Sequence, residues 1–523
     1  MLARLRSQAP AVRAGTASVR AEGASAGTRA PAAGAEGAST GAGTVPAAGS
    51  GRLPLIVLLS TQVLFLLWWA AFYPGLMSYD SISYVWHVTT GHWMANHSVA
   101  YDGLVWLSLR LTGDLGALTL AQTVAMSGAL AYAASALRGL GAPPIAAGLA
   151  AIAVPVLPAT GSFVVTVWKD VPFTVCAVLA TATLARLVSR RTTATLVALG
   201  AELTGMVVFR NNGFLFVAIA APLIVWSLRG TRLRLLAVVG VPLLLAFTLT
   251  GVVFPAMGIP GAPPSLTYAT AYGDIAVAFK RARDSFTPRD TAVMAGVAPL
   301  SHWRGSADCH TTDPTTQRPG FTAAADARNG ELIALWRRVI LRTPAVVAAA
   351  RLCRGSIAWK VVEGAGGPSA RTAVHGVGVP DDLFGWARWN AEMRAGPYRP
   401  ILAPRPLSAP LRDAATAFRD AAREPWLVWL FWRGAIWCYL AYAVVVAHAH
   451  ARRDRTVMVL AAVVLGQQLG VLLANPAQLY RYMVAPMIIG VLFLSLLPGY
   501  GGGRSGPGGG PRDLGGTGPH ASG

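Results

Sequence analysis

Long apolar runs recur along the chain and are separated by short polar segments. Ten of these runs reach or approach the roughly 20 mostly apolar residues that cross a bilayer as a helix. They are 54–73, 115–137, 143–163, 171–188, 193–209, 213–228, 235–254, 426–448, 456–474 and 480–499. The runs 193–209 and 213–228 are short, which leaves open a tilted or re-entrant path. The pattern predicts an all-α integral membrane protein with about ten transmembrane helices.

Outside the long segment 255–425, basic residues fall mainly in the N-terminal tail and in every second connection between these runs. Such connections face the cytoplasm in most membrane proteins. Both termini are therefore predicted to be cytoplasmic. The long segment 255–425, between the seventh and eighth spans, is predicted to be extracytoplasmic, and the rule does not extend to loops of that length. The arginines that decide the orientation are Arg52, Arg138, Arg186, Arg190, Arg191, Arg229, Arg232, Arg234, Arg452, Arg453 and Arg455.

Composition supports one polytopic protein rather than several soluble domains. Only 13% of the 523 residues are charged, against about 25% in soluble domains. The net charge of +21 does not indicate nucleic-acid binding, because the basic residues lie in clusters between apolar runs. Segments 1–52 and 500–523 are rich in Ala, Gly, Ser or Pro and are predicted to be disordered tails. Between them we expect a seven-span module at 53–254 with a first outer loop at 74–114, the segment 255–425, and three spans at 426–499.

Polar motifs gather in the connections predicted to lie outside. They are Ser78-Tyr79-Asp80-Ser81 followed by His87, His92, His97 and Asp102, then Trp168-Lys169-Asp170, Arg210-Asn211-Asn212-Gly213 and Tyr480-Arg481-Tyr482. Ionisable groups at the ends of spans often mark a functional site. A carboxylate there can act as a general base, and Lys or Arg can hold a phosphate. Together they suit group transfer from a lipid-linked phosphate donor, because the cations stabilise the leaving phosphate.

Each motif also has a structural alternative. Asp80 can cap the helix that follows it. The cations Lys169, Arg210 and Arg481 can be interface anchors beside aromatic residues. The three histidines are five residues apart, whereas helical metal pairs are usually three or four apart, so no metal site is predicted.

The four cysteines divide between the spans and the outer segment. Cys176 and Cys438 lie in apolar runs and are expected to be buried thiols. Cys309 and Cys353 both lie in 255–425, where a disulfide can persist outside the cytoplasm. Within the segment 255–425, residues 330–361 have helical character that Pro344 should divide in two. Their Arg and Trp content suits helices on the outer membrane surface, and a small soluble domain packed on the spans is the alternative. We expect acceptor binding in this segment.

In this order, the motifs resemble those of the GT-C superfamily of membrane glycosyltransferases, which includes protein mannosyltransferases and lipid A aminoarabinose transferases. The chain resembles still more closely certain bacterial membrane proteins that carry Trp-Lys-Asp, Arg-Asn-Asn-Gly and a late Arg-Tyr. The resemblance covers roughly 54–490. It implies transfer of a sugar from a polyprenyl-phosphate donor to an envelope glycan, lipid or protein on the extracytoplasmic face.

The resemblance implies that Asp80 is the catalytic base. Lys169, Arg210 and Arg481 would hold the donor phosphate. The supporting residues would be His97, Asp102, Trp168, Asp170, Asn211, Asn212, Tyr480 and Tyr482. Two departures from the family pattern stand out: His97 is followed by Ser98 rather than Pro, and no second acid adjoins Asp80. No cofactor is expected, and dependence on a divalent metal is left open.

The alternatives to a glycosyltransferase are a transporter or flippase of a lipid-linked intermediate and a non-enzymatic protein of envelope assembly. No P-loop or Rossmann fingerprint is present, so we expect no nucleotide site.

Overall fold

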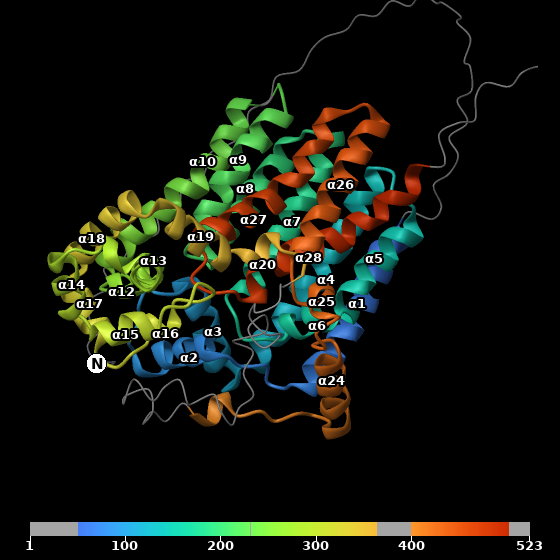
Figure 1. Cartoon of the computed structure of the whole chain (residues 1–523). Coiled ribbons are helices and arrows are strands. Elements are labelled where there is room, and N and C mark those ends of the chain that lie inside the picture. The colour runs from blue at the N-terminus through green and yellow to red at the C-terminus, as the bar shows by residue number, and fades with distance from the viewer. Residues whose placement is uncertain (1–50, 231, 363–398, 501–523) are drawn as a thin grey trace, which may run out of the picture. The chain divides into compact units, whose positions relative to one another are not determined.

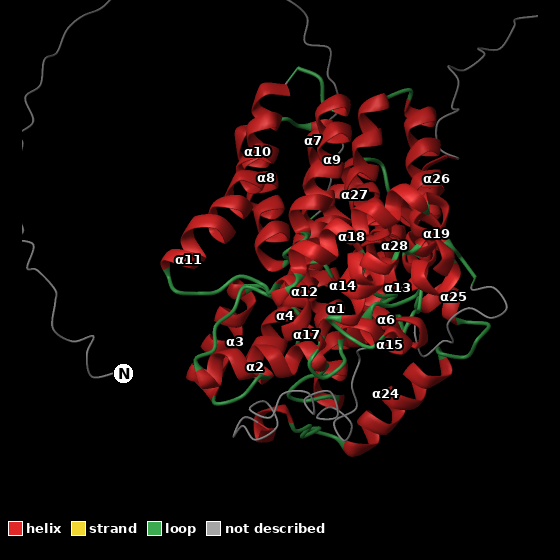
Figure 2. Cartoon of the chain, turned by 60° about the vertical axis from the view of Figure 1, so that its left-hand side comes forward, coloured by secondary structure: helices red, strands yellow, loops and turns green. Residues whose placement is uncertain are grey.

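A computed structural model describes residues 51–230, 232–362 and 399–500 (Figure 1). The predicted tails lie outside the described residues, apart from their inner ends. Within the described ranges the secondary structure is helical, with three isolated bridges and no strand (Figure 2). The side chains of Arg399 and of residues 498–500 are not described.

All ten apolar runs form helices in the described chain. Six helices are long and apolar enough to cross a membrane, or seven if one bent pair counts as a span. These six are α1 (Arg52–Ala71), α4 (Gly116–Gly139), α7 (Asp170–Ser189), α10 with η1 and α11 (Arg232–Ala256), η5 with α27 (Arg455–Ala474), and η6 with α28 and η7 (Tyr480–Leu497). The bent pair is α5 (Pro144–Val156) with α6 (Pro158–Val164), which meet at 71°. An all-helical membrane protein is therefore the architecture, whereas the count of ten spans stays a prediction.

The remaining three runs form shorter or shifted helices. α8 (Thr193–Phe209) and α9 (Gly213–Ser227) have 17 and 15 residues, in line with the short runs that predicted them. The eighth run begins instead with the single turn α25 (Val428–Phe431), and its long helix α26 (Ala435–Arg452) starts only after a break at Gly434. Glycine at this break permits close packing, because a Cβ on Gly434 would lie 2.3 Å from the Cβ of Met483.

The first outer loop folds into two helices, α2 (Tyr79–Thr90) and α3 (Val99–Thr112). Both views place them beyond one end of the long helices α8 and α10 (Figures 1 and 2). The segment that leads into α2 lies against the chain that leads into α7: Leu76 N donates to Val165 O at 2.9 Å, and Val167 N donates to Leu76 O at 2.9 Å. Gly75 makes this approach possible, because it has φ +152° and a Cβ there would lie 2.9 Å from Val165 O.

The segment after α11 forms a helical unit with its own apolar core. This unit runs from α12 to α20 and is called the outer unit. The described helices are α12 (Pro264–Thr267), α13 (Ala269–Arg281), η2 (Arg283–Ser285), α14 (Pro288–Ala295), α15 (Leu300–Gly305), α16 (Asp313–Thr316), α17 (Phe321–Ala327), α18 (Asn329–Arg342), α19 (Pro344–Arg354) and α20 (Ser356–Trp359). The break at Pro344 is confirmed. Side chains such as Tyr272, Trp303 and Leu335 are buried together. These helices therefore pack on one another, and their position on the outer membrane surface stays a prediction.

A buried carboxylate holds the centre of this unit. Asp274 of α13 accepts from Trp336 Nε1 at 3.0 Å and forms ion pairs with Arg351 at 2.6 Å and Arg354 at 3.0 Å. All of its hydrogen-bonding capacity is therefore directed at α18 and α19. Arg351 and Arg354 thus have a structural role in this unit.

The chain returns to the long helices through η4 (Arg399–Leu402) and α24 (Ala409–Ala421). Two backbone bonds fix this return at the end of α1: Arg405 N donates to Tyr73 O at 2.8 Å, and Leu407 N donates to Ala70 O at 2.9 Å. In Figure 1, α24 accordingly lies beside the blue end of α1.

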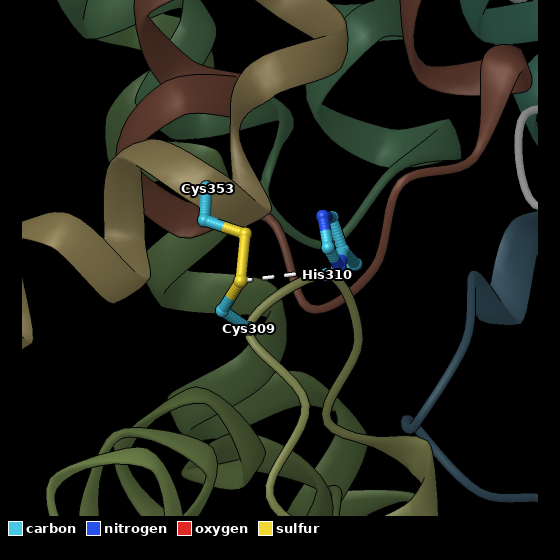
Figure 3. Close-up of side chains that lie close together, drawn as sticks. All are labelled: Cys309, His310 and Cys353. Carbon is cyan, nitrogen blue, oxygen red and sulfur yellow. Dashed lines mark hydrogen bonds between the residues drawn. A yellow bond between two sulfur atoms is a disulfide. The ribbon is translucent and has the colours of Figure 1, made fainter. Parts of the chain in front are cut away.

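A disulfide joins Cys309 to Cys353 within the outer unit (Figure 3). It closes a loop with a sequence separation of 44 residues. Cys176 and Cys438 are free, and Cys438 is buried. Both are thiols as expected, but Cys176 is only half-buried, whereas the sequence predicted that both would be buried.

Reduction should therefore destabilise the outer unit. Opening a loop of this length removes about 4 kcal/mol of unfolded-state restraint. We expect dithiothreitol to lower the Tm of the wild-type protein in detergent, and to leave the already lower Tm of the Cys309→Ala/Cys353→Ala variant unchanged. Thiol titration of the unfolded chain should find two free thiols before reduction and four afterwards. Four thiols without reductant would contradict the bond.

Candidate functional site

Asp80 lies in the first turn of α2 but does not cap it. Ser78 is the N-cap residue, and its backbone N–H donates to Ser81 Oγ at 2.9 Å in a capping box. Ser81 Oγ donates to Val167 O at 2.8 Å, and Trp168 Nε1 donates to Ser78 Oγ. The serines thus satisfy the helix end and attach it to the start of α7. The carboxylate of Asp80 is left free to face other elements.

Arg481 is the partner of Asp80. Its Nη1 lies 2.6 Å from Asp80 Oδ2 and 3.8 Å from Asp170 Oδ2. The guanidinium stands over the rings of Trp168, at 5.0 Å, and Tyr482, at 5.3 Å. Asp80 keeps a side-chain exposure of 19%, against 9% for Arg481. The pair joins residues 401 positions apart and leaves the carboxylate within reach of a ligand.

Burial alone would raise the pKa of Asp80, but the positive charges around it, with Arg481 foremost, outweigh burial and hold that pKa below its usual value. Tyr84 lies one helical turn further along α2, and its hydroxyl donates to Asp80 Oδ2 at 3.4 Å. Burial, and then the charge of Asp80, raise the pKa of Tyr84 well above its usual value, so the hydroxyl keeps its proton. Sequence reasoning missed Tyr84, although its i+4 spacing from Asp80 was the available signal.

Arg210 forms a second and more deeply buried pair with Asp170. Its Nη1 lies 3.0 Å from Asp170 Oδ1, and the two side chains are 5% and 1% exposed. The ion pair is close but not aligned as a hydrogen bond, so both oxygens of Asp170 keep unfilled acceptor positions. Arg210 Nε donates to Asn212 Oδ1 at 2.8 Å. The guanidinium is also enclosed by the rings of Phe173, Phe216 and Tyr482.

This enclosure changes the expected role of Arg210. A guanidinium held by a carboxylate, an amide and three rings has little surface left for a donor phosphate. Its geometry is that of a positioning residue, which orients Asp170 from the loop between α8 and α9. Asn211 extends the same loop to the first outer loop, because its side-chain amide donates to Ala95 O and Asn96 O, each at 3.1 Å.

Lys169 adjoins the cluster from the residue before α7. Its Nζ lies 2.6 Å from His97 Nδ1. Burial and the charge of Lys169 lower the pKa of His97 well below its usual value, so the ring is neutral at pH 7 and accepts from the ammonium. Burial also lowers the pKa of Lys169, while Asp80 and Asp170 oppose that shift. Among the described residues no carboxylate lies within ion-pair distance of Lys169.

The other candidate residues of the first outer loop take separate positions. Asp102 pairs with His87, whose Nδ1 lies 2.9 Å from Asp102 Oδ2. His92 stacks on Trp86 at 4.7 Å and bonds to Thr90. Burial raises the pKa of Asp102, and the bond from His87 opposes that rise. The Asp102–His87 pair therefore ties α3 to α2, and its two residues are fully buried.

The outer unit helps to place Arg481. Gln478 lies three residues before it and donates from Nε2 to Cys353 O at 2.8 Å and to Ser356 Oγ at 2.7 Å. In the opposite loop, Thr312 N donates to Pro476 O at 3.0 Å. The chain beside both cysteines of the disulfide is therefore hydrogen-bonded to the segment that leads into Arg481. Tyr480 packs its ring against Trp168 at 6.0 Å and Trp432 at 4.9 Å.

One further group has the composition of a metal site. Cys309, His310 and Cys353 offer ligand atoms within 4.8 Å of one another. However, Figure 3 shows both sulfur atoms engaged in the disulfide, and metal ligation requires thiolates. His310 Nδ1 lies 3.0 Å from Asp308 Oδ1. This group is therefore a covalent brace rather than a ligand set.

Comparisons with known proteins add little to this geometry. No protein-family model and no curated protein matches the chain. Among solved structures the chain is similar to ArnT from Cupriavidus metallidurans, in a crystal structure with bound undecaprenyl phosphate. The match covers 84% of this chain and 77% of that chain, with 14% identity and a TM-score of 0.32. A similarity at that level establishes neither a shared fold nor a shared activity, so function is argued from the residues alone.

The buried Arg210–Asp170 pair predicts a large effect on stability. Asp170→Asn leaves Arg210 charged, buried and without its counter-ion, which costs about 3–5 kcal/mol. Glu331→Gln is a matched control, because it breaks an exposed i,i+3 pair with Arg328 that is worth about 0–1 kcal/mol. We expect a clear fall in Tm for the first variant only, measured by thermal unfolding in detergent. Equal falls would contradict a specific role for the buried pair.

Acidification tests the Asp80–Arg481 pair. Because the folded pKa of Asp80 lies below its ordinary value of about 3.9, the pair stabilises the fold above that value and loses this contribution as the pH falls further. The difference in Tm between the wild type and Asp80→Asn should therefore stay constant from pH 8 to about pH 5 and shrink below about pH 4. A difference that already shrinks between pH 7 and pH 6 would place the Asp80 pKa on the wrong side of its usual value.

Proposed function

We propose that the chain is a membrane glycosyltransferase that moves a sugar from a polyprenyl-phosphate donor to a cell-envelope acceptor on the extracytoplasmic face. The observation that carries the proposal is the carboxylate of Asp80, 2.6 Å from Arg481, where motifs from four separate connections meet. A base and a cationic clamp at one end of apolar helices suit a substrate that has a polar head and a lipid tail.

The charges of this cluster leave room for an anion. Three cations, Lys169, Arg210 and Arg481, face two carboxylates, Asp80 and Asp170, so the five groups carry one surplus positive charge. Lys169 is half-buried and bonded to a neutral imidazole, which makes it the cation most open to a phosphate. Arg481 is the second, because its pair with Asp80 is partly exposed. Arg210 holds Asp170 behind them.

The pairing of Asp80 with Arg481 also couples binding to chemistry. A carboxylate with a depressed pKa is a weak base. A donor phosphate that binds Arg481 competes with Asp80 for the same guanidinium, and loss of that contact raises the basicity of the carboxylate. The acceptor is then activated chiefly when the donor is present.

The transfer step balances with the groups at hand. The acceptor hydroxyl oxygen forms a bond to the anomeric carbon of the sugar while its proton passes to Asp80. The bond between that carbon and the phosphate oxygen breaks, and polyprenyl phosphate leaves with the bonding electron pair. Lys169 and Arg481 stabilise the charge that develops on this phosphate. Direct displacement inverts the anomeric configuration.

Single substitutions in the cluster test the proposal. Purified protein is reconstituted with sugar-labelled lipid extract of the cells that produce it, and release of free polyprenyl phosphate is measured. We expect Asp80→Asn to lower turnover by about 10²–10⁴-fold while donor binding persists. Lys169→Met should weaken donor binding by about tenfold, through loss of a charge-assisted bond. Lys280→Met is the matched control, because Lys280 donates to Ala307 O in the outer unit and should leave both values unchanged.

The outcomes separate the competing functions. A flippase keeps both donor binding and translocation after Asp80→Asn, and a structural protein never binds the donor. Release that is equal in the wild type and in Asp80→Asn would remove the base from the mechanism. No release from either, while a known transferase is active in the same extract, would overturn the assignment as a glycosyltransferase.

A further inference from the structure

A small cavity lies between α24, the end of α1 and the segment Gly75–Met77. Its volume is about 80 Å³. On this measure one water needs about 10–15 Å³, so the cavity has room for several water-sized atoms, enough for a phosphate group. Its apolar wall includes Phe72, Leu76 and Met77, and Pro404 and Pro406 close another side. The polar wall comes from α24 alone.

Three side chains of α24 form this polar wall. Arg412, Thr416 and Arg419 line the cavity. Their spacing of four and then three residues places them on one face of the helix. The neighbouring positions Leu411 and Ala415 pack on the apolar cluster around Trp68, which fixes the rotation of α24. The polar face is therefore held toward the cavity by the apolar packing beside it.

Arg419 is buried and has no counter-ion among the described residues. The residue is 5% exposed, and its guanidinium stands 5.5 Å from the ring of Phe72. Its Nε has no hydrogen-bond partner, and within the described chain no carboxylate lies at ion-pair distance from it. Two other arginines near this end of the chain do have counter-ions, because Arg423 pairs with Asp420 at 3.0 Å and Arg405 with Asp114 at 3.2 Å.

An unpaired charge in such a wall is costly unless a partner fills it. Burial, and to a lesser extent the charge of Arg423, lower the pKa of Arg419 to about 10, so the group still carries its proton at neutral pH. Arg419 therefore keeps free hydrogen-bonding capacity at Nε beside the apolar residues of the cavity.

We propose that this cavity is an anion site, separate from the cluster at Asp80, in which Arg419 and Arg412 hold a phosphate group. A guanidinium binds phosphate oxygens in a bidentate manner, and Thr416 adds a hydroxyl. The position suits a lipid headgroup, because the cavity adjoins the last residues of the apolar helix α1. A soluble phosphate has the same chemistry, so the experiment below distinguishes the two sources. The inference does not depend on the proposed glycosyl transfer.

The test uses the purified full chain in detergent. Binding is measured by native mass spectrometry and by the shift in Tm, with dioleoylphosphatidic acid, dioleoylglycerol and inorganic phosphate as separate probes. The two lipids carry the same acyl chains and differ in the phosphate. We expect phosphatidic acid to bind at least about tenfold more tightly than diacylglycerol. Arg419→Met should abolish this preference, and Arg419→Lys should keep part of it.

Matched variants assign the effect to this cavity. Arg318→Met removes one positive charge from an exposed position of the outer unit, and it should leave the preference intact. If Arg419→Met does not fold, Arg412→Met at the half-buried edge of the cavity replaces it. A shift caused by inorganic phosphate alone, and lost in Arg419→Met, would support the site with a soluble ligand. Loss of the preference in Lys169→Met but not in Arg419→Met would assign the phosphate to the other cluster and overturn the inference. An unchanged preference in the Arg419 and Arg412 variants would do the same.

Discussion

The guanidinium of Arg481 is the charge on which this end of the molecule depends. It lies at the start of an apolar helix, where an unpaired ion would be expensive, and two carboxylates from distant segments surround it. Asp80 brings the first outer loop to it, and Asp170 brings the start of α7. Because Asp170 is also held by Arg210, the end of α8 joins the same arrangement. Four helix ends are thus fixed by charges that must compensate one another.

Hydrogen bonds between neighbouring segments restrain the backbone that carries these charged residues. The serines of the α2 capping box bond to the start of α7, so Asp80 cannot move without breaking that junction. The loop before Arg481 is bonded to the outer unit beside the disulfide. Rigid support of this kind is what a site for phosphate chemistry needs, because positioning and electrostatics supply most of its effect.

Much of this arrangement could be predicted from the sequence, for identifiable reasons. Apolar runs of sufficient length locate the helices, because a bilayer imposes that length, and Pro344 marks a helix break. The four motifs could be assigned to one face by counting spans. The pairing of each cation with its acid could not be predicted, because the sequence does not distinguish the roles of Lys169, Arg210 and Arg481. Their different burial in the fold distinguishes these cations. The pairing of Asp102 with His87 rather than with His97 is likewise visible only in the fold. Arg419 could not be singled out either, because a long arginine-rich segment does not show which of its arginines are buried without a counter-ion in the described fold.

Burial also explains why the two basic sites differ. At the Asp80 cluster, carboxylates already offset most of the positive charge, so under the proposed function a donor phosphate would compete with Asp80 for Arg481. In the α24 cavity no carboxylate of the described chain is within pairing distance of Arg419, so an anion there gains a full counter-ion contact without displacing one. The first arrangement favours exchange of the bound group, and the second favours retention.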